Sequence, residues 1–317
     1  MNEAALKARL KIIAQEKLKT FNEVWKQLLL ERFLARLSCS THREQFIFKG
    51  GLLLAQYIDL GRETTDIDLS MTKMKSEFSA IEHALCEIIA VSIDDSFRFE
   101  WVTMQILSQP HMEYTGFRAT IQAYFGNMKD KIHIDIGVGD MVVPNEKDYR
   151  PFEFNGKPLF VGEITMLVYP VESIFAEKLE TIVSKGSNNS RMKDYHDIVL
   201  MIKEPGLLAP AILSEKLQIT FEHRNTTFVV PIKFDAQEVS QLQNLWSNHL
   251  RGLGDIRKKL DLPDDMIDVL AEINSWLTNI QHQKTIDAMQ EARYGQLKSF
   301  KTVESLTDDL NDGGDYY

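Results

Sequence analysis

Two glycines directly after a short apolar segment, followed closely by two alternating aspartates, constrain the fold of this chain most strongly. Residues 46–51 read Phe-Ile-Phe-Lys-Gly-Gly, and residues 62–69 read Arg-Glu-Thr-Thr-Asp-Ile-Asp-Leu. In a β-strand the side chains at positions i and i+2 share a face, so Asp66 and Asp68 project together. Two adjacent carboxylates in apolar surroundings stay ionised only when a cation lies between them. We therefore expect a strand that presents both aspartates to a Mg²⁺ ion.

A third acid extends this pattern. In residues 131–138 isoleucines alternate with polar or small residues, so Asp135 faces away from the core-facing isoleucines. Beside the strand of Asp66 and Asp68, Asp135 completes a site for two Mg²⁺ ions, one activating an attacking hydroxyl and one holding a nucleoside triphosphate (NTP). The alternative is a structural ion pair between Asp135 and a nearby cation such as Lys131.

Candidate phosphate ligands surround the glycine pair. Gly50 and Gly51 lack a Cβ atom, so their N–H groups can approach a phosphate, and a helix that they open adds its positive end. A bare glycine pair is also an ordinary tight turn. Lys49 either steadies a phosphate or lies at the surface. Arg62 and Thr64 precede the acids and are expected to orient a carboxylate or the triphosphate, although Thr64 also suits an ordinary strand position.

The order of elements predicts an α/β fold in which a mixed sheet carries helices and a mainly helical domain follows. Strand-like segments fall at 45–49, 64–71, 97–108, 114–126 and 131–138, with an amphipathic helix at 77–91. After Pro170 we expect helices at 171–185, 190–203, 209–219, 236–250 and 263–290, interrupted by a strand-like segment at 228–232. The predicted domains are 1–165, which is catalytic, and 166–305, which completes the cleft. Residues 306–317 form an acidic, solvated tail.

Charge and helical periodicity describe the N-terminal region. The first forty residues have helical spacing, and Thr20 with Glu23 predicts a capping box. The net charge of −10 excludes a protein that coats nucleic acid through bulk electrostatics. Residues 1–60, however, carry ten Lys and Arg against six Asp and Glu. The N-terminal helices therefore either pack on the sheet or form an RNA-binding arm.

Several classes of protein are excluded. The two cysteines, Cys39 and Cys86, lie in neither a disulfide framework nor a metal-type spacing, and no histidine spacing predicts a transition-metal site. The chain does not open with a secretory signal pattern, and no apolar run reaches membrane-spanning length. We expect a cytoplasmic protein.

Longer stretches of sequence carry a family resemblance. Residues 33–42 read Phe-Leu-Ala-Arg-Leu-Ser-Cys-Ser-Thr-His and precede the two segments that define the glycine pair and the acids. Residues 172–183, 190–197 and 220–226 extend the match. Together these segments resemble the AbiEii-type abortive-infection toxins, which are nucleotidyltransferases and form the toxin half of a type IV toxin–antitoxin pair.

The resemblance implies a nucleotidyltransferase-type sheet and further site residues. It implies that Lys178, in an Ala-Glu-Lys-Leu context, contacts nucleotide phosphates. It also implies that Asp194 and Asp197 lie at the active-site cleft, where an acid fixes Lys178 or accepts a proton from the attacking hydroxyl. From the pattern alone, Lys178 is a solvated lysine on a helix face.

We therefore predict a nucleotidyltransferase toxin that uses Mg²⁺ to transfer a nucleotidyl group from an NTP to a hydroxyl. The leading acceptor hypothesis is tRNA, motivated by the basic N-terminal segment and by Arg-Lys-Lys at 257–259. The resemblance implies growth inhibition that a cognate antitoxin neutralises, and we expect no membrane contact and no direct DNA binding. Two alternatives stay open: a small-molecule or protein nucleotidyltransferase, and a non-catalytic module that binds a nucleotide or a partner chain.

Overall fold

The computed structural model describes residues 1–73, 77–107, 116–139 and 142–293. Its main sheet has seven strands in the order β3-β4-β5-β2-β1-β9-β6, and β7 and β8 form a separate hairpin. The strands are β1 (Phe46–Lys49), β2 (Asp66–Met71), β3 (Arg98–Leu107), β4 (Gly116–Phe125), β5 (Met128–Val138), β6 (Asn145–Asp148), β7 (Glu153–Phe154), β8 (Lys157–Pro158) and β9 (Thr165–Val168). The predicted mixed sheet is confirmed, because β2 pairs antiparallel with β1 and parallel with β5.

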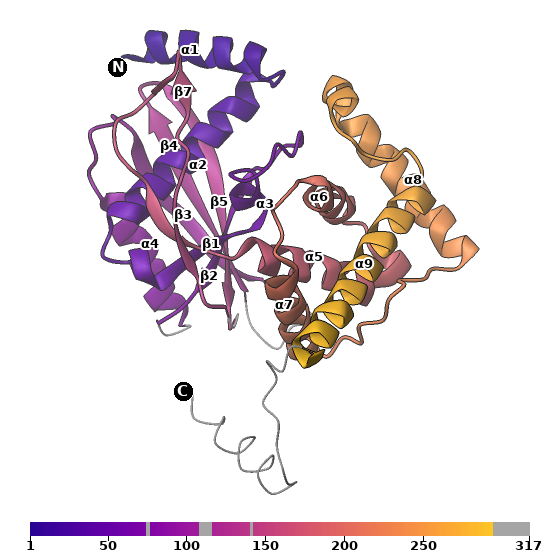
Figure 1. The fold of residues 1–317 in the computed structure, drawn as a ribbon. Helices are drawn as coiled ribbons and strands as arrows, with labels where there is room; N and C mark the ends of the chain where they lie inside the picture. Colours follow the sequence, from indigo (N-terminus) through magenta and orange to yellow (C-terminus); the bar gives the residue numbers. More distant parts are fainter. Residues whose placement is uncertain (74–76, 108–115, 140–141, 294–317) are drawn as a thin grey trace, which may run out of the picture.

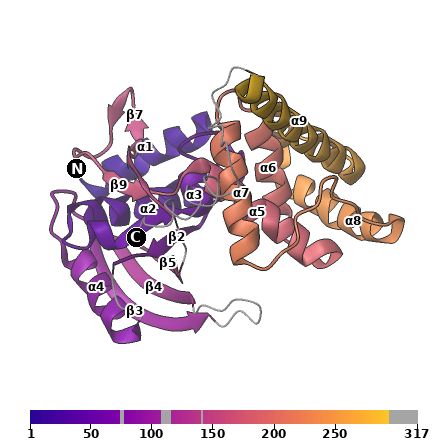
Figure 2. The ribbon, with the colours of Figure 1, turned by 60° about the horizontal axis from the view of Figure 1, so that its bottom comes forward.

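Within the described ranges, four α-helices belong to the sheet region, and five follow it in sequence. The first group is α1 (Glu3–Glu16), α2 (Phe21–Cys39), α3 (Gly50–Leu54) and α4 (Phe78–Ala90). The second group is α5 (Val171–Lys185), α6 (Met192–Lys203), α7 (Pro210–His223), α8 (Ala236–Gly252) and α9 (Met266–Arg293). Figures 1 and 2 show the second group gathered beside the sheet region. No helix in the described parts of the chain is both long and apolar enough to cross a bilayer.

The N-terminal helices pack against the sheet region. The capping box is present, since the Thr20 hydroxyl accepts from the Glu23 N–H at 3.2 Å and Glu23 Oε2 accepts from the Thr20 N–H at 2.6 Å. Helix α2 is buried along most of its length and contacts α4 and β5 (Figure 1). The structure therefore supports the interpretation of α2 as a packed helix.

Residues 228–232, predicted as strand-like, form no strand in the structure, and this prediction is wrong. Pro231 has no N–H to give to a ladder. The neighbouring Ile232 uses its backbone groups elsewhere: its N–H donates to Asn274 Oδ1 at 2.7 Å, and its carbonyl accepts from Asn274 Nδ2 at 2.9 Å. The side chain of Asn274 in α9 thus takes the hydrogen bonds that a neighbouring strand would otherwise make with Ile232.

The sheet extends slightly beyond the predicted domain boundary at residue 165. Strand β9 begins at Thr165 and pairs with both β1 and β6, so the sheet region ends at Val168. The helical region begins with Val171 at the start of α5. The predicted acidic tail, residues 306–317, lies outside the described residues.

Candidate active site

Two of the predicted acids are direct neighbours on adjacent parallel strands. Asp68 of β2 pairs in register with Asp135 of β5, and Asp66 pairs with His133. On the other side of β2, Lys49 of β1 pairs with Asp68. Register partners point to the same face of a sheet, so Asp66, Asp68 and Asp135, called here the strand carboxylates, project together. The predicted convergence of the three acids on one face is therefore present.

The pKa of Asp68 is raised above its ordinary value in this structure. Burial raises the pKa of Asp68, and the charge of Asp135 raises it further. Lys49, Lys193 and Lys178 act in the opposite direction without cancelling the rise. Because the like charge of Asp135 opposes ionisation, a cation placed between the two carboxylates would stabilise both.

Asp135 already has a cationic partner. Arg118 of β4, which pairs in register with Asp135, donates from Nε and Nη2 to the two carboxylate oxygens at 2.6 Å each. The same guanidinium lies 3.8 Å from Asp66 Oδ2. The structure thus contains an ion pair of the kind that the alternative interpretation of Asp135 requires, with Arg118 rather than Lys131 as the partner.

The glycine pair allows two charged side chains to approach the start of α3. Gly50 has a φ of +76°, and a Cβ atom there would lie 2.0 Å from Asp68 Oδ2. A Cβ atom on Gly51 would lie 2.9 Å from Arg62 Nη2. Because α3 has only five residues, its terminal dipole is small. The observed role of the pair is to make room for Asp68 and Arg62.

Gly50→Ala is expected to destabilise the fold by more than its backbone conformation alone explains. A left-handed residue other than glycine costs about 1–2 kcal/mol, and the contact with Asp68 adds to that cost. Gly206→Ala is the matched control, because Gly206 has a φ of +74° and nothing within 4 Å of its added Cβ. Urea unfolding should show the larger loss for Gly50→Ala, and equal losses would contradict the steric argument.

A buried ion cluster joins α5 to α6. Lys178 is only 8% exposed, so its interpretation as a solvated helix lysine is wrong. Its Nζ lies 3.0 Å from Asp194 Oδ1 and 2.7 Å from Asp197 Oδ2, and both acids are fully buried. Arg191 Nε donates to the other oxygen of Asp194 at 2.6 Å. The predicted contact between an acid and Lys178 is present.

The opposite charges in this cluster keep one another ionised. Burial lowers the pKa of Lys178, but Asp197 and Asp194 raise it by more, so its net shift is upward. Burial raises the pKa of Asp197, but Lys178 and Arg62 pull it well below its usual range. For Asp194, burial is likewise outweighed by Lys178 and Arg191, and its pKa is lowered.

Arg62 connects this cluster to the strand carboxylates. Its Nε and Nη2 donate to the two oxygens of Asp197 at 2.7 and 2.6 Å, and Nη1 donates to Thr64 Oγ1 at 3.4 Å. Arg62 lies in the loop before β2, so the ion pair holds α6 against the strand that carries Asp68. Arg62 therefore orients Asp197 in this structure, whereas we predicted that it orients a strand carboxylate or the triphosphate.

Lys49 takes part in a second link between the sheet and the helices. Its Nζ lies 3.5 Å from Glu177 Oε2 in α5 and 4.9 Å from the centre of the Tyr169 ring. Glu177 Oε2 also lies 3.7 Å from Arg224 Nη2, which follows α7. The partly buried Lys49 thus has packed partners on α5 as well as its strand neighbour Asp68.

A histidine pair lies behind the cluster. His196 is fully buried, and its Nε2 is 2.7 Å from the carbonyl oxygen of Leu60, so Nε2 must carry the proton. Its unprotonated Nδ1 then accepts a hydrogen bond from the N–H of His249 Nε2, 2.9 Å away. Burial is the main cause that lowers the pKa of His196, to about 4.

This lowered pKa predicts a loss of stability in mild acid. Below pH 6.5 the unfolded chain binds a proton at His196 that the folded chain takes up only near pH 4, so stability falls as pH falls between these values. From pH 7 to 5 this amounts to about 2 kcal/mol. We expect His196→Gln to flatten the pH dependence of the unfolding free energy, and His83→Gln, at a side chain 74% exposed, to leave it unchanged. Equal slopes for wild type and His196→Gln would contradict this assignment.

The chemistry of the strand carboxylates suits Mg²⁺. They offer only carboxylate oxygens, the ligands that a hard cation prefers. Among the described residues, no three His, Cys, Asp or Glu side chains lie close enough together, as they are positioned in this structure, to hold a metal ion.

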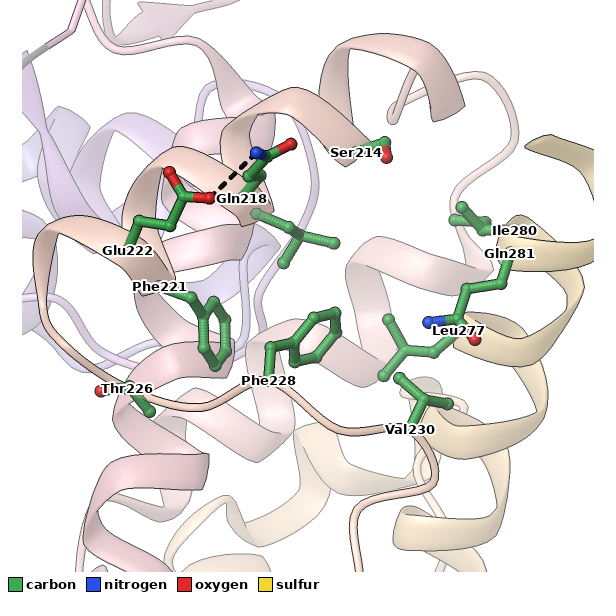
Figure 3. Close-up of a pocket in the computed structure, with 11 residues that line it drawn as sticks. Ser214, Gln218, Phe221, Glu222, Thr226, Phe228, Val230, Leu277, Ile280 and Gln281 are labelled. Carbon is green, nitrogen blue, oxygen red and sulfur yellow. Dashed lines mark hydrogen bonds between the residues drawn. The ribbon is translucent and has the colours of Figure 1, made fainter. Parts of the chain in front are cut away.

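A hollow of about 590 Å³ lies in the helical region, between α7, α9 and the segment that precedes α8 (Figure 3). Phe221 and Phe228 meet on its floor with their ring centres 4.5 Å apart. Its lining contains none of the predicted site residues. Thr226 lines this hollow and donates to Glu180 of α5 at 2.6 Å, which ties its wall to the helix that carries Lys178.

Sequence reasoning missed Arg118, although a signal was present. Residues 126 and 127, Gly-Asn, form a two-residue turn between β4 and β5. Counting outward in pairs from that turn places Arg118 opposite Asp135. Arg191 also gives no signal in the sequence, because an arginine on a helix face is commonplace and nothing local shows that it pairs with the buried Asp194.

Comparison with known proteins identifies the family of this chain. The family model described as the nucleotidyl transferase AbiEii toxin of type IV toxin–antitoxin systems matches residues 32–279. The crystal structure of JHP933 from Helicobacter pylori is similar over 86% of this chain and 99% of its own, with 14% identity and a TM-score of 0.43. That of a candidate nucleotidyltransferase from H. pylori is similar over 83% and 96%, with 14% identity and a TM-score of 0.42. No curated protein matches the chain. From the family match, the chain is a nucleotidyltransferase that belongs to the AbiEii toxins of type IV toxin–antitoxin systems.

Proposed function

We propose that this enzyme transfers a nucleotidyl group from an NTP to a hydroxyl in a Mg²⁺-dependent reaction, with the 3′ end of tRNA as the acceptor. The observation that carries the proposal is the register of Asp68 with Asp135, combined with the cations Lys49, Lys178 and Lys193 whose charges act on Asp68. Carboxylates for a divalent ion next to cations for phosphate are what nucleotidyl transfer requires.

Each group has a role in this proposal. Asp66, Asp68 and Asp135 would hold Mg²⁺, which when bound activates the acceptor hydroxyl and neutralises charge on the phosphates. The hydroxyl oxygen attacks the α-phosphorus, and pyrophosphate leaves as the bond to the β-phosphate breaks. Lys178 and Lys193 attract the triphosphate as point charges. Lys49 and the backbone of Gly50 and Gly51 are further candidate phosphate contacts, because Lys49 and Gly50 lie beside Asp68.

The contacts of Asp194 favour one of its two predicted roles. Both of its oxygens already accept hydrogen bonds, from Lys178 at 3.0 Å and from Arg191 at 2.6 Å. A carboxylate whose pKa is lowered in this way is a weak base. We therefore assign Asp194 to fixing Lys178, and the same argument assigns Asp197 to holding Lys178 and Arg62.

Labelling experiments test the donor and the acceptor together. The protein, Mg²⁺ and each α-labelled NTP are incubated with total tRNA, and we expect one NTP to label RNA and release pyrophosphate. Removal of Mg²⁺ with EDTA should abolish the label. Label on protein or on a small molecule would support the alternative acceptors, and no transfer from any NTP to any fraction of a cell extract would refute the proposed reaction.

We also propose that the enzyme inhibits growth and that a cognate antitoxin neutralises it, because the chain belongs to a toxin family. Expression of the chain alone should slow growth, and co-expression of its cognate antitoxin should restore it. Growth inhibition that persists in a variant without transfer activity would show that catalysis is not the cause.

A further inference from the structure

Arg118 lies between two of the strand carboxylates. Its Nη2 donates to Asp135 Oδ2 at 2.6 Å and lies 3.8 Å from Asp66 Oδ2. Asp66 and Asp135 belong to neighbouring parallel strands, and Arg118 reaches them from the next strand, β4. A cation shared by Asp66 and Asp135 would need the space that this nitrogen fills.

The guanidinium of Arg118 and a metal ion compete for the oxygens of Asp135. Mg²⁺ binds carboxylate oxygens at about 2.0–2.1 Å and requires lone pairs directed at the ion. Both oxygens of Asp135 accept short hydrogen bonds from Arg118. Release of these two bonds would leave the lone pairs of Asp135 available to an ion.

We propose that Arg118 is an internal counter-ion which Mg²⁺ displaces from Asp135 when the NTP binds, and that its guanidinium then binds a phosphate of the triphosphate. This inference rests on the proposed metal site. Before binding, Arg118 offsets the repulsion among the strand carboxylates. After binding, the divalent ion supplies that charge, and the triphosphate supplies oxygens that match the two-pronged guanidinium.

The surroundings of Arg118 permit this exchange. Its side chain is 36% exposed, whereas Arg62, in its ion pair with Asp197, is only 8% exposed. Asp66 and Asp135 are also accessible, at 34% and 25%. An arginine at this exposure can leave its partner for solvent or a ligand at modest cost, unlike a buried one.

Metal binding to the nucleotide-free protein tests the first step without relying on activity. Titration of Mn²⁺, followed by electron paramagnetic resonance, should show tighter binding to Arg118→Ala than to wild type, by about five-fold or more once the competing hydrogen bonds are gone. Arg118→Lys keeps the positive charge but lacks the planar guanidinium that gives two parallel hydrogen bonds. Its affinity for Mn²⁺ should therefore fall between those of wild type and Arg118→Ala. Arg98→Ala, at an exposed arginine of β3, is the matched control and should equal wild type. Thermal unfolding of each variant establishes that it is folded.

The outcomes separate the two proposals. If wild type binds Mn²⁺ and Arg118→Ala binds it equally or more weakly, Arg118 does not compete with metal and this inference fails, while the metal site stands. If neither binds Mn²⁺, the metal site fails and the inference fails with it. The second step, binding of a phosphate by Arg118, is tested by measuring KM for NTP at saturating Mg²⁺. We expect this KM to rise about ten-fold in Arg118→Ala and to be partly restored in Arg118→Lys. An unchanged KM would overturn phosphate binding by Arg118.

Discussion

An Asp68→Asn variant is expected to lose about three orders of magnitude in the rate of nucleotidyl transfer while it keeps its fold. Asparagine has the shape of aspartate, so it fits beside Gly50, where Asp68 Oδ2 packs. It lacks the charge that, together with Asp135, would hold a divalent ion. The measurement is the rate of label transfer at saturating NTP and Mg²⁺, together with the unfolding midpoint of the purified variant.

A control on the same sheet removes a charge without touching the site. Asp130 of β5 pairs with Lys26 of α2 at 2.7 Å, and Asp130→Asn should keep nearly full activity. Expression of Asp68→Asn should also no longer slow growth. A folded Asp68→Asn variant with at least a tenth of wild-type activity would remove Asp68 from the proposed metal site.

Strands β1 to β5 were predicted from the sequence, largely because their residues alternate between apolar and polar, whereas β6 and β9, which complete the main sheet, were not predicted. In β4, Phe117, Ala119, Ile121, Ala123 and Phe125 are buried, and the residues between them are not fully buried, as the alternation predicted. The segment at 228–232 has the same apolar character but becomes irregular. Its partner is one side chain, Asn274, from a helix distant in sequence, and no local pattern reports such a contact.

The site was predictable where its geometry is local. The alternation of Asp66 with Asp68, and of Asp135 with its isoleucine neighbours, fixes their face of the sheet as soon as the strands pair in parallel. The ion pair of Arg62 with Asp197 depends on how α6 docks on the loop before β2, across 135 residues of sequence. Docking of this kind is decided by the packed helices as a whole, so the sequence marked both residues as candidates without showing that they meet.

The largest effect on stability is expected for Asp197→Ala, which should lower the free energy of unfolding by about 3–5 kcal/mol. Asp197 is fully buried and accepts from both Arg62 and Lys178. Its removal leaves the Lys178 ammonium with only Asp194 and leaves the Arg62 guanidinium without its carboxylate. An unpaired charge in such a buried position costs far more than the pair contributes, so the loss exceeds that of an ordinary ion pair. Urea unfolding at pH 7 measures it.

The comparison with an exposed pair decides whether burial is the cause. Asp255 pairs with Lys258 at 2.8 Å, and their side chains are 85% and 80% exposed, so Asp255→Ala should leave the free energy of unfolding nearly unchanged. A similarly small loss for Asp197→Ala would mean that the cluster does not hold α6 against the loop before β2. Lys178 would then be free to turn toward a triphosphate. A large loss means instead that Lys178 is held in place by its two acids, so that an NTP meets a lysine already fixed in position.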